Sequence, residues 1–560
     1  MKTDMFKAVR RVLLVAAAST AVLAAIAAPA MAGRWVTGDI QTHSYLSDGK
    51  QTFNDVMRNG FSVYGLDYLA DTDLGGQSTV SPAGLSYQGG VWRWITLSND
   101  SFPTVLAGRA TYPERTIIEG LDWNVPAHDS AAVGIIGAGN EPIGISNFEY
   151  QFDRLDTDIS RVNEGTKAVT HTEPDPTDPT KTVTVTDFPA MPFGKNNLTQ
   201  ADMLTALDWL ENNYGDQSYM VVDHPSRKDL WSVGDFRAMS DEAPDVALGF
   251  AGIPGHQAAT ARGDYGQYIK ADGTVTSDPT QADQTLTDHA RTYGGADWMV
   301  ATVGGVWDSL LGEGRHWWVY DNSEFRTVNT AYKDAAGNTI GLDYFDFWPG
   351  QYGKTYTYVN KLNDQSLLNG MQSGDSYIVD GDLINGLKFT VSDGKHTATM
   401  GGTLNTAAGK TLTVSIAVKS PKVNSNGDKV KLDHVDAISG DVTGLIPASD
   451  PAYTTNATNA STKVAKTFGK SAWSVQSGWK VMTFKVKASK DMYYRLRGTN
   501  LAPNTATQTD AQGNPLQDTL DYVDYPNPKD GGATTVHGNL PDNAWADLWF
   551  YSNPVFVNVK

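Results

Sequence analysis

Short apolar runs alternate with helix-like stretches over residues 33–380. Met203–Asn213 has apolar residues at helical spacing and leads into the strand-like run Tyr219–Val222. In the same way, Trp307–Gly312 leads into Trp317–Tyr320. Strands that alternate with helices are typical of α/β proteins. This region is therefore predicted to form a βα barrel or an open βα sheet.

The period of the pattern changes to two in residues 381–560. Apolar residues alternate with small or polar ones in Leu412–Val418 and again in Met482–Val486. Turn signals such as Asp393-Gly394 separate such runs. A period of two with frequent turns is typical of antiparallel strands. We predict an antiparallel β-sandwich domain here, with the aromatic segment Trp545–Phe556 as its final strand.

Three stretches interrupt the first region and are expected to form surface loops. They are Ser86–Ala110, Ala168–Pro189, which is dense in Thr, Pro and Asp, and Ile269–Gln284. Insertions of this composition beside an active site often serve as lids.

Residues 1–32 have the pattern of a cleavable secretory signal. A basic start precedes the apolar run Val12–Ala28, and the small-residue triplet Ala30-Met31-Ala32 comes just before Gly33. A membrane anchor is the alternative, but the run is rich in alanine and ends at Pro29. We expect the mature chain to begin at Gly33 and to be periplasmic or secreted.

The chain is strongly acidic. Its formal net charge is −19, and residues 1–32 carry four Lys or Arg and one Asp, so their removal lowers the charge to −22. An acidic surface of this kind repels nucleic acid and anionic lipid. The chain has no cysteine, which excludes disulfides, thiolate metal sites and a cysteine nucleophile. No apolar run after the signal is long enough to span a bilayer.

Two segments close to Gly33 carry candidate chemistry. Gly38–Gly49 and Gly65–Asp73 each read as a strand that ends in polar, metal-competent side chains, with the helix-like stretch Thr52–Asn59 between them. Parallel strands joined through a helix bring their carboxyl ends to one edge, where α/β proteins place their sites. We expect a functional site at this edge.

Histidine is scarce, with ten residues in the whole chain, so its placement is informative. His43, His128 and His224 each follow an apolar stretch and lie beside carboxylates or a turn. Imidazole and carboxylate are the ligands of zinc, manganese and iron, and a hydrolytic site leaves one position open for water. Any one of these histidines is more often structural, but together they predict a metal site.

These segments resemble the polymerase-and-histidinol-phosphatase (PHP) family of metal-dependent phosphoesterases. The family opens with G-D-x-H-x-H-x-x-x-S-D-G and continues with G-x-D-x-x-x-x-T-D-H, a pattern that this chain follows except at Gln41 and Leu74. The resemblance continues as far as residue 326 through Gly120-Leu121-Asp122, His128, His224-Pro225 and Ser323–Arg326. It implies an α/β fold in which a distorted PHP-type (β/α) barrel (33–380) precedes the β-sandwich domain (381–560).

The resemblance also implies which residues bind metal. The candidate ligands are Asp122, His128 and His224 for a first ion; His43, Asp122 and Glu324, with Gln41 as a weak amide ligand, for a second; and Asp48 at a third site. The third site is dismantled, because Leu74 and Arg326 stand where the family has histidines.

Arg326 and His256 are the candidate catalytic residues. Arg326 puts a permanent positive charge where a cation would lie, and could grip a phosphate or pair with a neighbouring acid. His256 follows a Pro-Gly turn and could line the pocket as an acid or an anion ligand, or only cap the turn. Arg262, in a segment that resembles a secreted branch of the family, and Gln41 are the candidate substrate-binding residues.

Two functions fit this sequence. The preferred one is an exported metal-dependent hydrolase, a phosphoesterase in which one or two zinc or manganese ions activate water against a small-molecule phosphoester or related ester. We expect no nucleic-acid partner and no integral membrane segment after signal cleavage. The alternative is a non-catalytic descendant of the PHP family that binds a ligand or a partner. The lost ligands favour it, as do five tryptophans expected near the mouth of the site: Trp92, Trp94, Trp123, Trp317 and Trp318.

Overall fold

A computed structural model describes the protein over residues 33–560 with internal gaps. The gaps are 138, 162–168, 176–177, 189–194, 260–261, 266–267, 270–274, 277–290, 329, 334–338, 344–345, 519–522, 527–534 and 539–541. The predicted secretory signal, residues 1–32, lies outside the described residues. Within the described part of the chain, no helix has both the length and the apolarity needed to cross a membrane.

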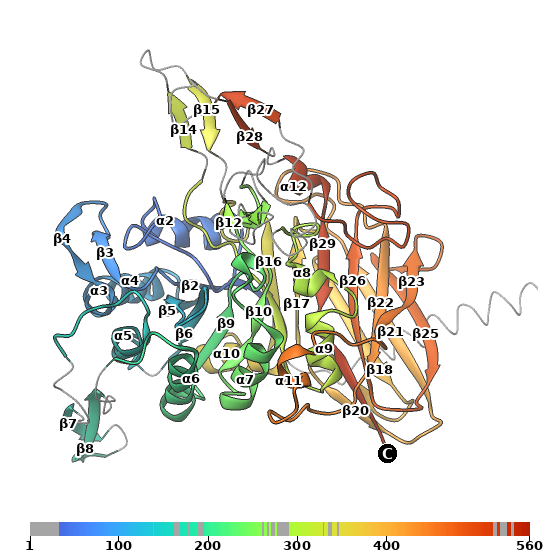
Figure 1. The fold of residues 1–560 in the computed structure, drawn as a ribbon, viewed down its shortest axis with the longest axis horizontal. Coiled ribbons are helices and arrows are strands. Elements are labelled where there is room, and N and C mark those ends of the chain that lie inside the picture. Colours follow the sequence, from blue (N-terminus) through green and yellow to red (C-terminus); the bar gives the residue numbers. More distant parts are fainter. Residues whose placement is uncertain are drawn as a thin grey trace, which may run out of the picture.

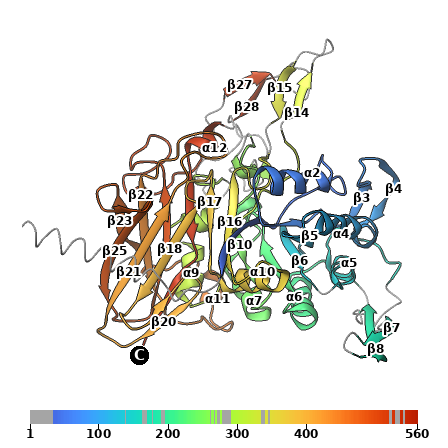
Figure 2. The same ribbon diagram turned by 180° about the vertical axis from the view of Figure 1, so that it is seen from behind.

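Seven strands form the sheet of the N-terminal β/α region (Figures 1 and 2). In spatial order they are β13 (Trp318–Asp321), β10 (Ala247–Ile253), β9 (Ser218–Val222), β6 (Ser130–Ile135), β5 (Thr116–Asn124), β2 (Tyr68–Asp71) and β1 (Arg34–Asp39). The neighbours are parallel except for β6, which runs antiparallel to β5 and β9. Just beyond β13 the chain returns to the other edge, where the N–H of His43 donates to the carbonyl of Phe325 at 2.8 Å. The carboxyl ends of β1 and β13 therefore lie close together.

Helices gather around these strands at the left of Figure 1. They are α2 (Phe53–Met57), η1 (Arg58–Val63), α3 (Arg93–Thr96), η2 (Leu97–Ser101), α4 (Phe102–Thr111), α5 (Glu141–Phe152), α6 (Gln200–Tyr214), η3 (Arg227–Asp229), α7 (Val233–Glu242), η4 (Arg262–Asp264), α8 (Trp298–Ala301), α9 (Val306–Gly312) and α10 (Asp364–Ser373).

Helix α6 shows how the local sequence starts an element. Thr199 and Asp202 form a reciprocal cap, in which the Thr199 hydroxyl accepts from the Asp202 N–H and the Asp202 carboxylate accepts from the Thr199 N–H. Such a box satisfies two backbone donors that a helix N-terminus leaves unpaired. Met203, Leu207 and Leu210 then bury one face completely. The helix predicted at Met203–Asn213 and the strand predicted at Tyr219–Val222 are both confirmed.

The prediction of a surface loop at Ser86–Ala110 is wrong. This stretch folds as β4 (Ser86–Trp92), which pairs with β3 (Gln77–Val80), followed by α3, η2 and most of α4. Its apolar residues Leu97 and Val105 are fully buried, and this burial makes the helices part of the core rather than a loop.

Four two-stranded hairpins stand apart from the main sheets in addition to β3–β4. They are β7 (Val169–Asp175) with β8 (Asp178–Phe188), β11 (Tyr268–Ile269) with β12 (Val275–Thr276), β14 (Thr330–Lys333) with β15 (Thr339–Asp343), and β27 (Val523–Pro526) with β28 (Thr535–Gly538). The first of these lies in the predicted insertion Ala168–Pro189, and most of the predicted insertion Ile269–Gln284 lies outside the described residues. The hairpins β14–β15 and β27–β28 lie side by side at the top of Figures 1 and 2.

The C-terminal region consists of two sheets whose strands are antiparallel, as its period of two predicts, except for the parallel pair of β20 and β30. One continues the first sheet from β1 through β16 (Gly353–Val359), β17 (Ser376–Asp380), β29 (Trp549–Ser552), β26 (Met492–Thr499), β22 (His434–Asp441) and β23 (Lys463–Gly469), with β30 (Val555–Val559) and β20 (Thr403–Thr406) alongside. The other is β19 (Thr397–Ala398), β18 (Gly386–Ser392), β21 (Thr411–Lys419), β25 (Trp479–Lys487) and β24 (Ser474–Gln476). Two short helices, α11 (Ala452–Thr455) and α12 (Asp542–Ala546), accompany them. Apolar residues of both sheets share one core, which includes Phe389, Val414, Leu496 and Phe550.

The single final strand predicted at Trp545–Phe556 is two strands. The segment begins in α12, and Asn553-Pro554 separates β29 from β30. Proline has no N–H to donate to a sheet, so the ladder is interrupted at this position.

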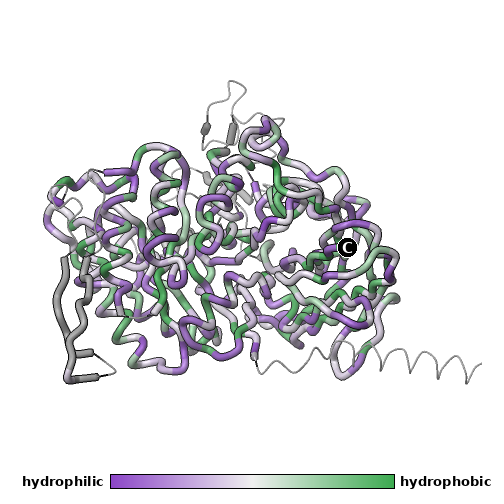
Figure 3. The backbone as a smooth tube through the Cα atoms, turned by 90° about the horizontal axis from the view of Figure 1, so that it is seen from below, coloured by the Kyte–Doolittle hydropathy of each residue, from purple (hydrophilic) through white to green (hydrophobic). Residues whose placement is uncertain are grey.

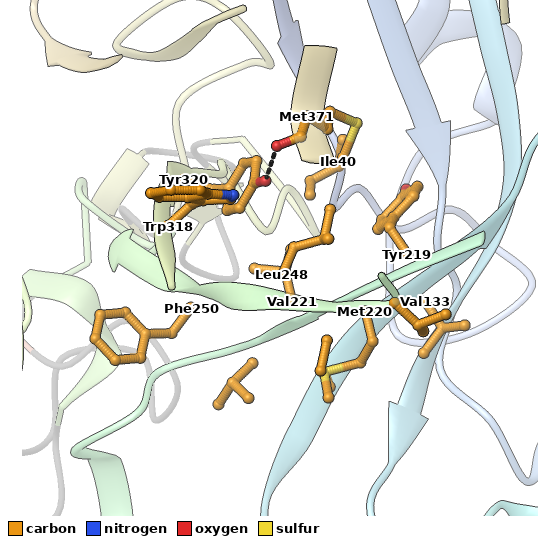
Figure 4. Close-up of a cluster of buried hydrophobic side chains, with 14 of the residues drawn as sticks. Ile40, Val133, Tyr219, Met220, Val221, Leu248, Phe250, Trp318, Tyr320 and Met371 are labelled. Carbon is orange, nitrogen blue, oxygen red and sulfur yellow. Dashed lines mark hydrogen bonds between the residues drawn. The ribbon is translucent and has the colours of Figure 1, made fainter. Parts of the chain in front are cut away.

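The core of the β/α region is continuous with its strands. Figure 4 shows Val221, Leu248 and Phe250 packed between neighbouring strands, with the Tyr320 hydroxyl donating to the carbonyl of Met371 in α10 at 3.1 Å. In Figure 3, hydrophobic stretches of the backbone gather in the interior, and hydrophilic stretches are frequent at the outside. Three of the tryptophans expected near the mouth belong to the core, because Trp123, Trp317 and Trp318 are at most 1% exposed. That expectation is wrong for these three.

One buried carboxyl in this frame makes stability depend on pH. Burial raises the pKa of Asp375, just before β17, to about 7, and the hydrogen bond from Thr399 only partly offsets it. The folded protein thus holds this proton more tightly than the unfolded chain, so stability is lost as pH rises through the interval from about 4 to 7. We expect the free energy of unfolding of Asp375→Asn, relative to that of the parent, to rise by about 1–2 kcal/mol from pH 5 to pH 8. Thermal melts at the two pH values measure this, with the exposed Asp216→Asn as control. Equal gains at both pH values would contradict the prediction.

Candidate metal centre

His224, His256 and Glu324 form the one potential metal-binding group found among the described residues. One ligand atom of each lies within 4.8 Å of the others, and all three residues are at most 1% exposed. Glu324 Oε2 lies 2.6 Å from His224 Nε2 and 2.8 Å from His256 Nε2. The three residues follow β9, β10 and β13, which are adjacent parallel strands, so the sheet brings their carboxyl ends to one point.

The backbone at all three residues is strained. His224, His256 and Glu324 have φ values of 39°, 56° and 45°, among only nine described non-glycine residues with positive φ. L-residues rarely adopt this region, and such strain persists where the surrounding structure holds it for a functional purpose. The strain is independent of the side-chain distances and points to the same three residues.

Polar atoms without hydrogen bonds surround the group. Among the described residues, His224 Nδ1 and Glu324 Oε1 make no hydrogen bond, although both side chains are buried and the facing atoms His224 Nε2 and Glu324 Oε2 contact each other. The same holds for both oxygens of Asp223, for Asp122 Oδ1 and for the amide of Gln41. Buried polar groups are nearly always paired, and a bound ion is one explanation when they are not. Imidazole nitrogens and carboxylate oxygens suit a zinc or manganese ion, so the residues present fit a metal.

Of the three protonation states, those of His224 and Glu324 agree with this fit. Burial, and then the charge of Arg227, lower the pKa of His224 to about 4, so its ring is neutral at pH 7. Burial alone would raise the pKa of Glu324, but contacts with His224 and His256 outweigh burial and hold it well below its usual range. A neutral imidazole and an ionised carboxylate are the forms that bind a cation. Burial alone would lower the pKa of His256, but the carboxylates of Asp346 and Glu324 outweigh burial and raise it to about 9, so a cation would have to displace a proton from this ring.

His43 and Asp122 lie beside this group. His43 Nδ1 lies 2.7 Å from Asp48 Oδ1, and His43 Nε2 lies 3.6 Å from Asp122 Oδ2. Burial raises the pKa of Asp122 to about 7. Asp48 is in turn linked to Glu324 through Arg326. The structure therefore brings together seven predicted site residues, which are His43, Asp48, Asp122, His224, His256, Glu324 and Arg326.

Arg326 is anchored among these acids. Its Nε lies 2.9 Å from Asp48 Oδ2 and its Nη2 lies 3.9 Å from Glu324 Oε2. Of the two readings of Arg326, pairing with neighbouring acids is what the structure shows. The guanidinium thus supplies a positive charge between two carboxylates beside the group.

His128 is not a member of the ligand group. Its ring stacks on Trp231 with centroids 4.2 Å apart, its Nδ1 lies 2.8 Å from the carbonyl of Leu230, and its Nε2 lies 3.9 Å from Asp235 Oδ1. Its predicted partners Asp122 and His224 are not grouped with it. A role for His128 as a ligand stays a prediction.

Arg262 makes its hydrogen bonds to residues outside the ligand group. Its guanidinium donates to Asp547 Oδ2 at 3.1 Å, to the Tyr352 hydroxyl at 2.7 Å and to Gln257 Oε1 at 2.9 Å. These contacts join η4 to the C-terminal region, and they occupy Arg262 in a buried network. Substrate binding by Arg262 stays a prediction, and so does substrate binding by Gln41, which is fully buried.

Two features of the site were missed in the sequence. His256 belongs to the potential metal-binding group, whereas the sequence suggested that it acts as an acid or binds an anion. The available signal was its position just after β10, which matches the position of His224 just after β9. Asp346, whose Oδ1 lies 2.5 Å from His256 Nδ1, carried no signal, because it is 90 residues away in the chain.

Comparisons with known proteins give little further information. No protein-family model matches the chain, and no curated protein matches it in sequence. One solved structure, a two-domain protein from Bacteroides vulgatus described as containing a predicted PHP-like metal-dependent phosphoesterase, aligns with 90% of this chain and 96% of its own. The identity is 10% and the TM-score 0.31. A similarity at this level carries no argument about the fold or the activity of this chain.

Proposed function

We propose that this protein is a metal-dependent hydrolase that acts on phosphoesters or related esters. The observation that carries the proposal is the buried group His224, His256 and Glu324, with its strained backbone and its ligand atoms that converge within 4.8 Å. The set of imidazoles and a carboxylate without thiolate favours zinc or manganese, in one ion or two. Export through residues 1–32, to the periplasm or the medium, is part of the proposal.

The fold supports a related proposal. We propose that the β/α region is a distorted PHP-type barrel, because residues just beyond β13 return to the start of the sheet. The parallel bridge between Thr42 and Phe325 and the hydrogen bond from His43 to Phe325 join the two edges. The antiparallel sheets that follow are then a β-sandwich domain.

The residues of the site have separable roles in such a reaction. A bound divalent cation supplies a Lewis acid that activates water and polarises the ester. His224, His256 and Glu324 hold it, and burial excludes bulk water from them. Asp48 orients His43 through the contact at Nδ1, which turns Nε2 toward Asp122. Arg326 offsets negative charge that develops beside Glu324, as fixed positive groups do in water-excluded sites.

Metal content and turnover test the proposal together. We expect the chain from Gly33, loaded with zinc or manganese, to retain at least one ion and to hydrolyse one class in a panel of phosphomonoesters, phosphodiesters and carboxyl esters. His256→Ala should lose turnover by at least about 100-fold, since it removes a ligand. His396→Ala is the control, because that histidine is 57% exposed in the C-terminal region. Less than one ion retained by the parent protein would overturn the proposal.

The non-catalytic alternative has one observation in its favour. Arg326 is locked between Asp48 and Glu324, so a fixed cation replaces part of the metal chemistry that the PHP resemblance implies. A protein that retains metal but hydrolyses no ester in the panel would favour this ligand-binding function.

A further inference from the structure

The carboxylate of Asp346 connects three parts of the candidate centre. Its Oδ1 lies 2.5 Å from His256 Nδ1, and its Oδ2 accepts the backbone N–H groups of Arg326 at 2.5 Å and Thr327 at 2.8 Å. The side chain is 3% exposed, so water does not compete strongly for these contacts. No other described carboxylate contacts a ligand ring and the backbone close to Glu324 at the same time.

The contact with His256 decides which ring nitrogen faces the centre. A carboxylate at Nδ1 keeps a proton on that nitrogen and leaves Nε2 as the ligand atom, and it also fixes the plane of the ring. His256 Nε2 accordingly points to Glu324, with its nitrogen 2.8 Å from Oε2.

The backbone contacts position the other ligand. Arg326 and Thr327 lie two and three residues after Glu324, so holding their N–H groups restrains the segment that carries Glu324. Asp346 also donates its own N–H to the carbonyl of Thr327 at 3.3 Å. Asp346 and Thr327 thus join the two ends of the insertion that carries the hairpin β14–β15, which lies at the top of Figure 1.

We propose that Asp346 is a positioning residue of the metal centre, which fixes His256 as an Nε2 ligand and sets its distance from Glu324. This inference rests on the proposed function. The proposed role of Asp346 is more than structural packing. The backbone N–H groups need only a hydrogen-bond acceptor, whereas His256 needs a carboxylate that keeps the proton on Nδ1.

Zinc affinity of the chain from Gly33, measured by competition with a chelator, tests the inference. Asp346→Asn keeps an oxygen for the backbone N–H groups but replaces the carboxylate, and we expect it to bind Zn²⁺ about 10- to 100-fold more weakly. Asp346→Glu restores the charge and should recover part of the affinity. Asp375→Asn, a buried acid outside the centre, is the matched control and should bind like the parent.

A double-mutant cycle separates positioning from a general structural effect. If Asp346 acts through His256, Asp346→Asn should cost little further affinity in a His256→Ala background. The absorption spectrum of the Co²⁺-loaded protein should also change in Asp346→Asn, because the ligand set is altered. Should Asp346→Asn fail to fold, Asp346→Ser, a shorter acceptor without charge, takes its place.

The outcomes separate this inference from the proposed function. Parent-like Zn²⁺ affinity in a folded Asp346→Asn variant, or an equal loss with and without His256, overturns the positioning role and leaves the metal centre intact. Absence of Zn²⁺ binding in the parent protein overturns both.

Discussion

Replacing His224 by alanine is expected to abolish the stabilisation that a divalent cation gives this protein. A ligand that binds only the folded state stabilises it by about 2.7 kcal/mol at a free concentration of 100 times Kd. The ring of His224 is neutral at pH 7, and its Nε2 lies 2.6 Å from Glu324 Oε2, the atom that also contacts His256. Thermal melts of parent and variant with and without zinc give the comparison directly.

The control for this experiment is His396→Ala, which should keep the full zinc-dependent gain. A second comparison, His128→Ala, shows whether the histidine stacked on Trp231 contributes to binding. If His224→Ala still gains stability with zinc as the parent does, the cation binds elsewhere and the group at the strand ends is not the metal centre.

The second large effect is expected at the junction of the two regions, where Asp308→Ala should destabilise the protein by about 3–5 kcal/mol. Arg495 on β26 donates to both oxygens of Asp308 on α9, at 2.8 and 2.7 Å, and both side chains are fully buried. The Tyr493 hydroxyl also donates to Asp308, at 2.8 Å. Removing the carboxylate leaves a guanidinium buried without its counter-charge, which costs far more than the pair contributes.

Denaturation monitored by fluorescence and by circular dichroism measures this loss. Lys490→Ala removes an ion pair with Asp441 in which the lysine is 58% exposed, and it should cost less than about 1 kcal/mol. A loss of similar size in the two variants would show that the α9–β26 contact does not hold the regions together.

The sequence predicted the elements well where local pattern decides them. Helix α6 and strand β9 follow from apolar spacing and a capping box that lies within a few residues. The change to a period of two predicts the strands that follow Asp380, but β16 and β17, which precede that change, also pair antiparallel in the same sheet. The loop predicted at Ser86–Ala110 was wrong because composition reports polarity, whereas the burial of Leu97 depends on what the rest of the chain supplies.

The candidate site was predicted only in part for the same reason. His43 and His224 were found because each follows a strand-like stretch in the sequence, whereas Asp122, which lies within β5, was found through the family resemblance. The pairing of His256 with Asp346 and of Arg326 with Asp48 was not visible. Those contacts depend on the order and register of the strands and on the route of the insertions between them.

The sequence by itself therefore determined where helical spacing changes to a period of two, which strand-like stretches lead into imidazole or carboxylate, and that no thiolate is present. Only the tertiary structure decided which strand ends meet. The adjacency of β9, β10 and β13 placed His224, His256 and Glu324 within 4.8 Å and left His128 against Trp231. The physical reason is that hydrogen-bonded registers between distant strands set distances of a few ångström, whereas local patterning sets only the direction in which each side chain leaves its own strand.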